Sequence, residues 1–276
     1  ILNFLRSECV KKGQLTPHYH YVSRPPFTEA EAVRRAIYLA GQTDTPLYIA
    51  HMTCREAIAE LQKAKGTGQR VSGETCTHYL TTTKEVLDNP DFNEAAKFVC
   101  SPALRDREDC EALWQALSDG LLTAVSSDHC GIDVAELKQA GRNDFTQIPN
   151  GSPDRLHMVW TEGVCTGKLT RQKFVDVIAT QPAKINGIYP RKGTLAVGSD
   201  ADVVIFDPNY EGTVHLADNP NGVDYNLYEG RRQSGRVETV LLRGQVVVEN
   251  AKFVGRYGQG KFIPANMYAS GYENRK

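Results

Sequence analysis

The chain has 276 residues, of which 41% are hydrophobic and 24% charged, and its 32 basic and 33 acidic residues leave a net charge of −1. These values are typical of a folded globular protein and exclude disorder as the main state. Because the charges are scattered and no apolar run approaches the roughly 18 residues of a membrane span, we expect a soluble protein that binds neither nucleic acid nor membranes.

The first two thirds of the chain alternate between helical and strand patterns. In chain order we predict a helix over 28–41, a strand over 45–51, a helix over 53–64, a strand over 70–76, a helix over 106–117, a strand over 121–127 and a helix over 170–180. Two capping boxes, Thr28–Glu31 and Thr53–Glu56, are expected to begin the first two helices. This alternation predicts an α/β fold with a parallel sheet and crossover helices.

The pattern changes close to residue 190. Short strands are predicted over 201–207, 237–242 and 245–249, and turn residues separate them. Such a series indicates a small antiparallel unit. We therefore predict two domains, one over residues 1–190 and one over residues 191–276.

Two strands of the predicted parallel sheet end in a side chain that can bind a metal ion. His51 ends the run 45–51, and Asp128 follows the run 121–127. In parallel α/β barrels the reactive groups lie at the carboxyl ends of the strands. Imidazole and carboxylate are good ligands for zinc, and a carboxylate beside such an ion can also carry a proton. The spacing by itself leaves open a structural histidine and an Asp that caps a helix.

The other histidines and the cysteines leave further alternatives open. His78 could be functional or structural, and for His18 and His20 we favour a loop packed by its own aromatic residues over a metal-binding H-x-H. The seven cysteines are odd in number and never form a C-x-x-C pair, which is typical of reduced, cytoplasmic thiols. We expect them to be buried as small hydrophobic residues rather than to act as nucleophiles.

Eight short strings occur in a characteristic order along nearly the whole chain. They are Ile49–Thr53, Gly73–Leu80, Ser101–Arg105, Ser127–Cys130, Gly141–Gly151, Pro190–Thr194, Gly198–Asp202 and Val223–Asn226. Together they resemble the dihydropyrimidinase and D-hydantoinase family of the amidohydrolase superfamily. The resemblance implies the second half of a TIM-type (β/α)8 barrel in residues 1–190, followed by part of a small β-sandwich in residues 191–276.

The resemblance also implies a site for two divalent metal ions, usually zinc, at the carboxyl face of the barrel. Its ligands in the family are an H-x-H on the first strand, a carboxylated Lys on the fourth, one His each on the fifth and sixth, and an Asp on the eighth. By this match His51 is the sixth-strand ligand and Asp128 the eighth-strand ligand, which also transfers the proton. Ser101 and Asn150 match positions whose backbone groups hold the cyclic amide.

Four of these six ligands have no counterpart in the chain. We therefore expect Ile1 to follow the family's fifth-strand string, and the chain to be the carboxyl-terminal part of a longer enzyme that lacks the first five barrel strands. With one His and one Asp, and with three strands that cannot close a barrel, the chain is expected to be inactive alone. The family further implies a homotetramer.

The implied activity is the metal-dependent ring opening of dihydrouracil, dihydrothymine or 5-substituted hydantoins, with a place in pyrimidine catabolism. Two alternatives stay open: a cyclic amidohydrolase of the allantoinase or dihydroorotase type, and a non-catalytic dihydropyrimidinase-related scaffold protein. Because a scaffold has no need of ligands at both positions, His51 and Asp128 count against the second alternative.

Overall fold

The computed structural model describes residues 1–131, 133–134, 154–218 and 222–266, and the chain divides into two compact units. The first unit consists of Ile1–Arg155 and Val214–Arg231, and the second of Leu156–Thr213 and Arg232–Lys276. These units are defined by compactness, whereas the predicted boundary near residue 190 marks the end of the barrel part of the sequence. That boundary stays a prediction.

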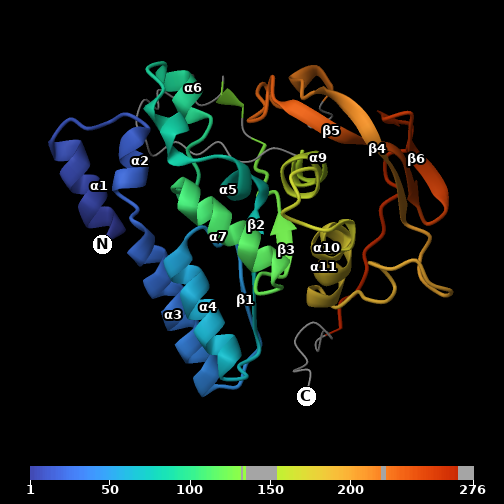
Figure 1. The fold of residues 1–276 in the computed structure, drawn as a ribbon, viewed down its shortest axis with the longest axis horizontal. Coiled ribbons are helices and arrows are strands. Elements are labelled where there is room, and N and C mark those ends of the chain that lie inside the picture. The colour runs from blue at the N-terminus through green and yellow to red at the C-terminus, as the bar shows by residue number, and fades with distance from the viewer. Residues whose placement is uncertain (132, 135–153, 219–221, 267–276) are drawn as a thin grey trace. The chain divides into compact units, whose positions relative to one another are not determined.

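The first unit contains a parallel sheet of three strands (Figure 1). These are β1 (Leu47–Ile49), β2 (Val71–Cys76) and β3 (Ala124–Ser126), and they pair in the order β1-β2-β3. The register places Leu47 beside Val71 and Glu74 beside Ala124. This sheet confirms the predicted α/β class with parallel strands. Since the strands run in one direction, their three carboxyl ends meet at the same edge.

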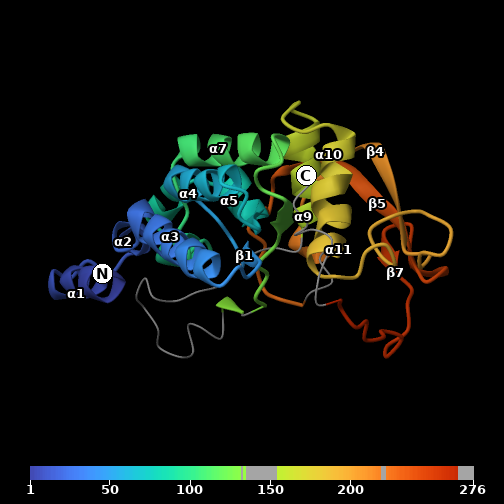
Figure 2. The same cartoon turned by 90° about the horizontal axis from the view of Figure 1, so that it is seen from below.

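Helices precede the sheet, connect its strands and pack against it. They are α1 (Leu2–Lys11), α2 (His18–Val22), α3 (Pro26–Gln42), α4 (Arg55–Gly66), α5 (Thr77–Thr81), α6 (Phe92–Ala96) and α7 (Arg107–Ser118), with 3-10 turns at Lys84–Asp88 and Leu216–Asp218. Helices α3, α4 and α7 lie side by side on one face of the sheet (Figure 2). Leu61 of α4 and Leu113, Trp114 and Leu117 of α7 are buried there, so the apolar stripes read from the sequence form the core.

Both predicted capping boxes are wrong. Helix α3 begins two residues before Thr28, and α4 begins two residues after Thr53. Thr28 Oγ1 donates to the Pro25 carbonyl oxygen at 2.8 Å, and Thr53 Oγ1 donates to the carboxylate of Glu29. A bond between residues 24 positions apart therefore replaces the local cap at Thr53, because tertiary partners compete with local ones for the same side chain.

The predicted loop at His18 and His20 is also wrong, because both lie in α2. His20 is buried, and its Nε2 donates to the Cys100 carbonyl oxygen at 2.6 Å. His18 Nδ1 lies 2.6 Å from Asp88 Oδ1. Residues two apart on a helix point about 200° from each other, so the two rings face different partners. The H-x-H pattern here has a structural role.

The second unit is built around an antiparallel sheet in the order β4-β5-β6-β7. Its elements are α9 (Arg155–Val159), α10 (Arg171–Val175), α11 (Gln181–Ile185), β4 (Val203–Thr213), β5 (Arg232–Leu242), β6 (Gln245–Glu249), β7 (Lys252–Phe253) and π-helical turns at Trp160–Val164 and Asp176–Thr180. The sheet confirms the predicted antiparallel unit. Thr170 caps α10 as predicted, since its hydroxyl accepts from the Lys173 amide at 3.1 Å. In the described part of the chain, no helix is long and apolar enough to cross a membrane.

Gly73 lies in the middle of β2, where the sheet packs against its helices. A Cβ at this position would come within 2.7 Å of Met52 Sδ and 3.2 Å of Leu61 Cδ2. We expect Gly73→Ala to lower the free energy of unfolding by about 1–3 kcal/mol, because a packed core has no room for the added methyl group. Urea denaturation measures this loss.

Gly66 is the matched control for this substitution. It is the last residue of α4, and a Cβ there would meet no atom within 4 Å. Gly66→Ala is expected to change the free energy of unfolding by less than about 0.5 kcal/mol. Equal losses for the two variants would contradict the packing described for β2.

Candidate functional site

Each strand of the parallel sheet is followed, two residues after its end, by a side chain that can bind a metal ion. His51 follows β1, His78 follows β2 and Asp128 follows β3. Because the carboxyl ends of the three strands meet at one edge, this repeated spacing brings the three side chains to the same edge of the sheet.

His51 and Asp128 share an uncommon backbone conformation. Their φ angles are 41° and 47°, in the left-handed region that residues with a Cβ rarely adopt. Such a conformation costs on the order of 1–3 kcal/mol and persists only where the surrounding structure imposes it. Strained residues of this kind concentrate at functional sites, and here they coincide with both metal ligands predicted from the sequence.

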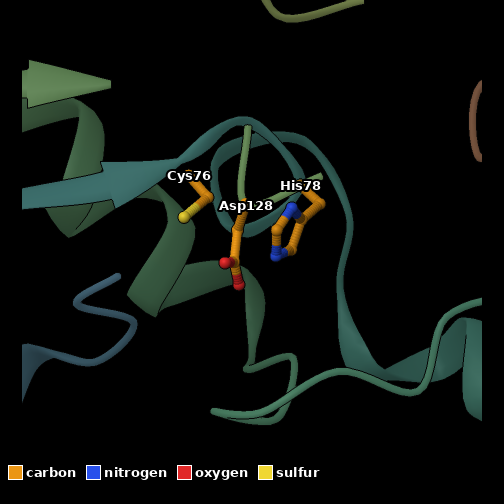
Figure 3. A group of neighbouring side chains, drawn as sticks. All are labelled: Cys76, His78 and Asp128. Carbon is orange, nitrogen blue, oxygen red and sulfur yellow. The ribbon is translucent and has the colours of Figure 1, made fainter. Parts of the chain in front are cut away.

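Asp128 belongs to a cluster with Cys76 and His78 (Figure 3). The Cys76 thiol, a His78 ring nitrogen and an Asp128 carboxylate oxygen all lie within 4.8 Å of one another. In Figure 3 the Asp128 carboxylate lies between the other two side chains. Cys76 and His78 are buried, whereas Asp128 is half-buried. A thiol, an imidazole and a carboxylate at this separation form a set of donors suited to a divalent cation.

Burial shifts the pKa values of two of the three side chains in this cluster. Burial, together with the nearby His51, lowers the pKa of His78 to about 3, so its ring is uncharged at neutral pH. Burial also raises the pKa of the Cys76 thiol, whose Sγ lies 3.2 Å from Ser126 Oγ. His78 Nε2 is buried and has no hydrogen-bond partner among the residues that the structure describes. A buried nitrogen without a partner, beside a carboxylate, fits a site for a cation.

Two of the predicted site residues line one cavity of about 580 Å³ in the first unit. His51 and Ser101 both contribute to its wall, next to Glu29, Pro102 and Arg105. The structure therefore brings His51 and Ser101 together at the cavity, and Asp128 together with His78 in the cluster. The charge of a protonated His51 acts on His78 in the same direction as burial, toward a lower pKa of its ring. The fourth predicted residue, Asn150, lies outside the described residues.

Hydrogen bonds from other elements hold the loop that carries Ser101. Tyr79, which is buried next to His78 in the sequence, donates from its hydroxyl to the Pro102 carbonyl oxygen at 2.7 Å. On the other side of Ser101, the Cys100 carbonyl oxygen accepts from His20 of α2. The backbone of this loop is thus fixed at the residues on both sides of Ser101, as a rigid contact to a substrate requires.

A buried ion pair ties the Ser101 loop to the loop of His51. The side chains of Arg105 and Glu29 are 2% and 9% exposed, and Arg105 Nη2 lies 3.1 Å from Glu29 Oε2. Thr53, two residues after His51, donates its amide to Glu29 Oε1 at 2.7 Å, and its Oγ1 accepts from Arg105 Nε at 2.9 Å. Arg105 also donates to the Arg24 carbonyl oxygen at 2.5 Å. The Glu29–Arg105–Thr53 network therefore couples both loops to helix α3.

From the sequence, His78 is compatible with a functional or a structural role, and Cys76 is expected to be a buried hydrophobic residue. The signal that could have found His78 is its position two residues after the end of a strand, which it shares with His51 and Asp128. For Cys76 the sequence holds no such signal, because its neighbours come from a strand about 50 residues further along the chain.

Comparisons with known proteins agree with this geometry. The model of the Amidohydrolase family matches residues 30–247. D-hydantoinase of Ralstonia pickettii is 46% identical over 269 residues, which cover 96% of this chain and 58% of the relative. A solved D-hydantoinase structure is similar with a TM-score of 0.93 at 46% identity, covering 97% of this chain and 59% of that one. A solved dihydropyrimidinase from Brevibacillus agri NCHU1002 is similar with a TM-score of 0.92 at 42% identity, covering 99% of this chain and 59% of that one. The chain therefore spans less than two thirds of the length of these relatives.

Proposed function

Because the chain belongs to the amidohydrolase family, we propose that it forms part of a metal-dependent site that hydrolyses cyclic amides. The substrates would be dihydropyrimidines such as dihydrouracil and dihydrothymine, or 5-substituted hydantoins. The observation that carries the proposal is the shared edge of the sheet, where His51 and Ser101 line one cavity and Asp128 lies beside His78. Relatives named D-hydantoinase and dihydropyrimidinase support this choice of substrate.

Two divalent metal ions, zinc in our proposal, would be held partly by His51 and Asp128. The buried Nε2 of His78 and the donor chemistry at this edge fit such a cation. The other ligands, including a carboxylated Lys, would come from the length of the relatives that this chain does not match. If bound, the ions would supply Lewis acidity, which would polarise the ring carbonyl and lower the pKa of the attacking water so that it reacts as hydroxide.

The residues of this chain have separate roles in the proposed reaction. Asp128 takes the proton of the attacking water and passes it to the amide nitrogen that leaves, so the ring opens to an acyclic product with a new carboxylate. The loop of Ser101, fixed at Pro102 and Cys100, holds the amide of the ring through its backbone. In our proposal Asn150 makes a second such contact.

Three further properties belong to the same proposal. We place the protein in the cytoplasm, because all seven cysteines are free and five of them are buried. We also propose a homotetramer and a place in pyrimidine catabolism, both from the family resemblance.

Ring-opening assays on the full-length protein test this function. Dihydrouracil and a 5-substituted hydantoin are expected to be hydrolysed, and a chelator is expected to remove the activity until zinc is added back. Faster hydrolysis of allantoin or dihydroorotate would favour the allantoinase or dihydroorotase alternative. A protein that binds metal but opens none of the four rings would overturn the proposal, and a protein that neither binds metal nor turns over would favour the non-catalytic scaffold.

A further inference from the structure

We propose that Asp224 and Asn226 are positioning residues for the substrate, because they hold the chain on both sides of the segment that carries Asn150. The inference rests on the proposed function, which assigns a substrate contact to Asn150, and it deepens that function by naming the residues that place this contact. Neither Asp224 nor Asn226 has a role in the proposed reaction so far.

Both residues belong to a part of the chain that packs with the first unit although its neighbours in the sequence do not. Strand β4 ends at Thr213 and β5 begins at Arg232, and both strands lie in the second unit. The chain between them, Val214–Arg231, belongs to the first unit. We call residues 223–231 the return segment. Its middle is part of the buried interior of the first unit, since four consecutive side chains are buried there: Tyr225, Asn226, Leu227 and Tyr228.

Asp224 holds the chain that leaves β3. Its backbone amide donates to Asp133 Oδ1 at 3.1 Å, and its own Oδ1 accepts from the Val134 amide at 2.8 Å. The two bonds run in opposite directions between the same two segments, so neither segment can slide along the other without losing both. Asp133 and Val134 come after Asp128 and before Asn150 in the sequence. Asp224 therefore fixes the chain at the point where it leaves the described part of the site.

Asn226 holds the chain where it comes back to β3. Its Nδ2 donates to Asp154 Oδ2 at 2.7 Å, and its Oδ1 accepts from the Tyr228 amide at 2.8 Å. A bond from an amide to a carboxylate is charge-assisted, and such bonds are stronger than those between neutral groups. The next residue, Arg155, donates from Nη1 to the Val125 carbonyl oxygen of β3 at 2.7 Å. Residues 154 and 155 are therefore tied to the return segment on one side and to the sheet on the other.

The return segment is itself anchored to α5, the helix that follows β2. Arg231 Nη1 donates to the Thr81 carbonyl oxygen of this helix at 3.2 Å, and the Arg231 guanidinium lies 5.4 Å from the centre of the Tyr228 ring. Thr81 Oγ1 lies 3.4 Å from the Tyr228 hydroxyl oxygen. One short segment thus connects the elements that follow β2 and β3, and it gives Asp224 and Asn226 a fixed base.

These anchors should affect the binding of the substrate more than its chemical conversion. The place of a substrate contact depends on the two points at which its segment joins the rest of the fold. A contact that holds the ring equally in the ground state and in the transition state determines KM, whereas the proton transfer by Asp128 determines kcat. Loss of the bond between Asn226 and Asp154 is therefore expected to raise KM and to leave kcat nearly unchanged.

Asn226→Asp in the full-length protein tests this expectation. The new side chain has nearly the same shape and can still accept from the Tyr228 amide, but it donates nothing and places a second carboxylate against Asp154. KM for the cyclic amide that the unsubstituted protein opens, dihydrouracil or a 5-substituted hydantoin, is expected to rise about 10–100-fold, the usual effect of a small misplacement. The value of kcat is expected to stay within about threefold, because Asp128 is unchanged.

A second substitution and a control show whether the bond itself is responsible. Adding Asp154→Asn to Asn226→Asp again places an amide donor opposite a carboxylate, and it is expected to return KM to within about threefold of the original value. Asn186→Asp is the matched control. Asn186 Nδ2 also donates at 2.8 Å, but to the Pro182 carbonyl oxygen at the end of α11 in the second unit. This variant is expected to keep both constants within about twofold.

Hydrogen exchange provides a measurement that needs no substrate. Peptides that contain Asp154 and Arg155 are expected to exchange faster in Asn226→Asp than in the unsubstituted protein, and to return to the original rate in the double variant. An unchanged KM in Asn226→Asp, or unchanged exchange in a protein with normal turnover, would overturn the inference and leave the proposed function standing. A protein that opens no ring, with exchange that rises in Asn226→Asp, would instead refute the proposed function while the anchoring by Asn226 holds.

Discussion

Asp128→Asn is expected to lower kcat for the ring opening of cyclic amides by about 10²–10⁴-fold, the usual effect of removing a group that transfers a proton in the reaction. The substitution replaces a carboxylate that can hold a proton with an amide that cannot. Asn has nearly the same shape as Asp and tolerates the left-handed backbone that this position adopts at φ 47°. The fold should therefore persist, with an unfolding temperature close to that of the unsubstituted protein.

Asp44→Asn provides a closely matched control. Asp44 has the same side chain and almost the same φ, 48°, but it precedes β1 and thus lies at the opposite end of that strand from His51. Its side chain is 93% exposed. This variant is expected to keep kcat and KM within twofold. Substantial turnover in Asp128→Asn, or an equal loss in Asp44→Asn, would refute the role of Asp128 in proton transfer.

Arg105→Met is expected to lower the free energy of unfolding by about 3–5 kcal/mol, because it leaves the buried carboxylate of Glu29 without its cation. The two side chains are only 2% and 9% exposed, so solvent screens the attraction between their charges weakly. Thr53 Oγ1 and the Arg24 carbonyl oxygen lose a donor at the same time. Urea denaturation measures the loss, and Glu29→Gln combined with Arg105→Met should recover part of it.

Arg35→Met is the control for this prediction. Arg35 pairs with Glu31 on the surface of α3 at 3.3 Å, with side chains that are 65% and 57% exposed. Exposed pairs of this spacing contribute about 0.3–0.5 kcal/mol, so the substitution should lower the free energy of unfolding by no more than this amount. If Arg105→Met is as mild as Arg35→Met, the network at Thr53 does not hold the two loops together.

Periodic patterns in the sequence predict much of the fold. The strand runs ending at His51, Cys76 and Ser127 correspond to β1, β2 and β3, and the α/β alternation predicts their parallel pairing. Helix starts were predicted less well. Thr53 looks like a cap in the sequence, but in the structure its side chain bonds to Glu29, and no local pattern carries a contact between residues so far apart.

Some residues of the candidate site can likewise be predicted from the sequence, and others are identified only by the structure. His51 and Asp128 can be found from the sequence because each follows a strand and matches a family string. Cys76 lies near Asp128 only because the neighbouring strand brings Asp128 to it, and His78 Nε2 is unpaired among the described residues because of how the residues around it pack. Both are properties of packing. Packing between distant segments of the chain produces no periodic pattern that can be recognised in a single sequence. The position of His51, His78 and Asp128 two residues after a strand becomes informative only when the strand ends are known.

Anomalous scattering from zinc gives the most direct test of the central claim that this edge of the sheet is a metal site. Crystals of the full-length protein grown with zinc would be measured at the zinc absorption edge. The account predicts an anomalous peak about 2.0–2.2 Å from a ring nitrogen of His51 or a carboxylate oxygen of Asp128. A crystal of active, zinc-containing protein with its anomalous peaks elsewhere, and none at either residue, would contradict it.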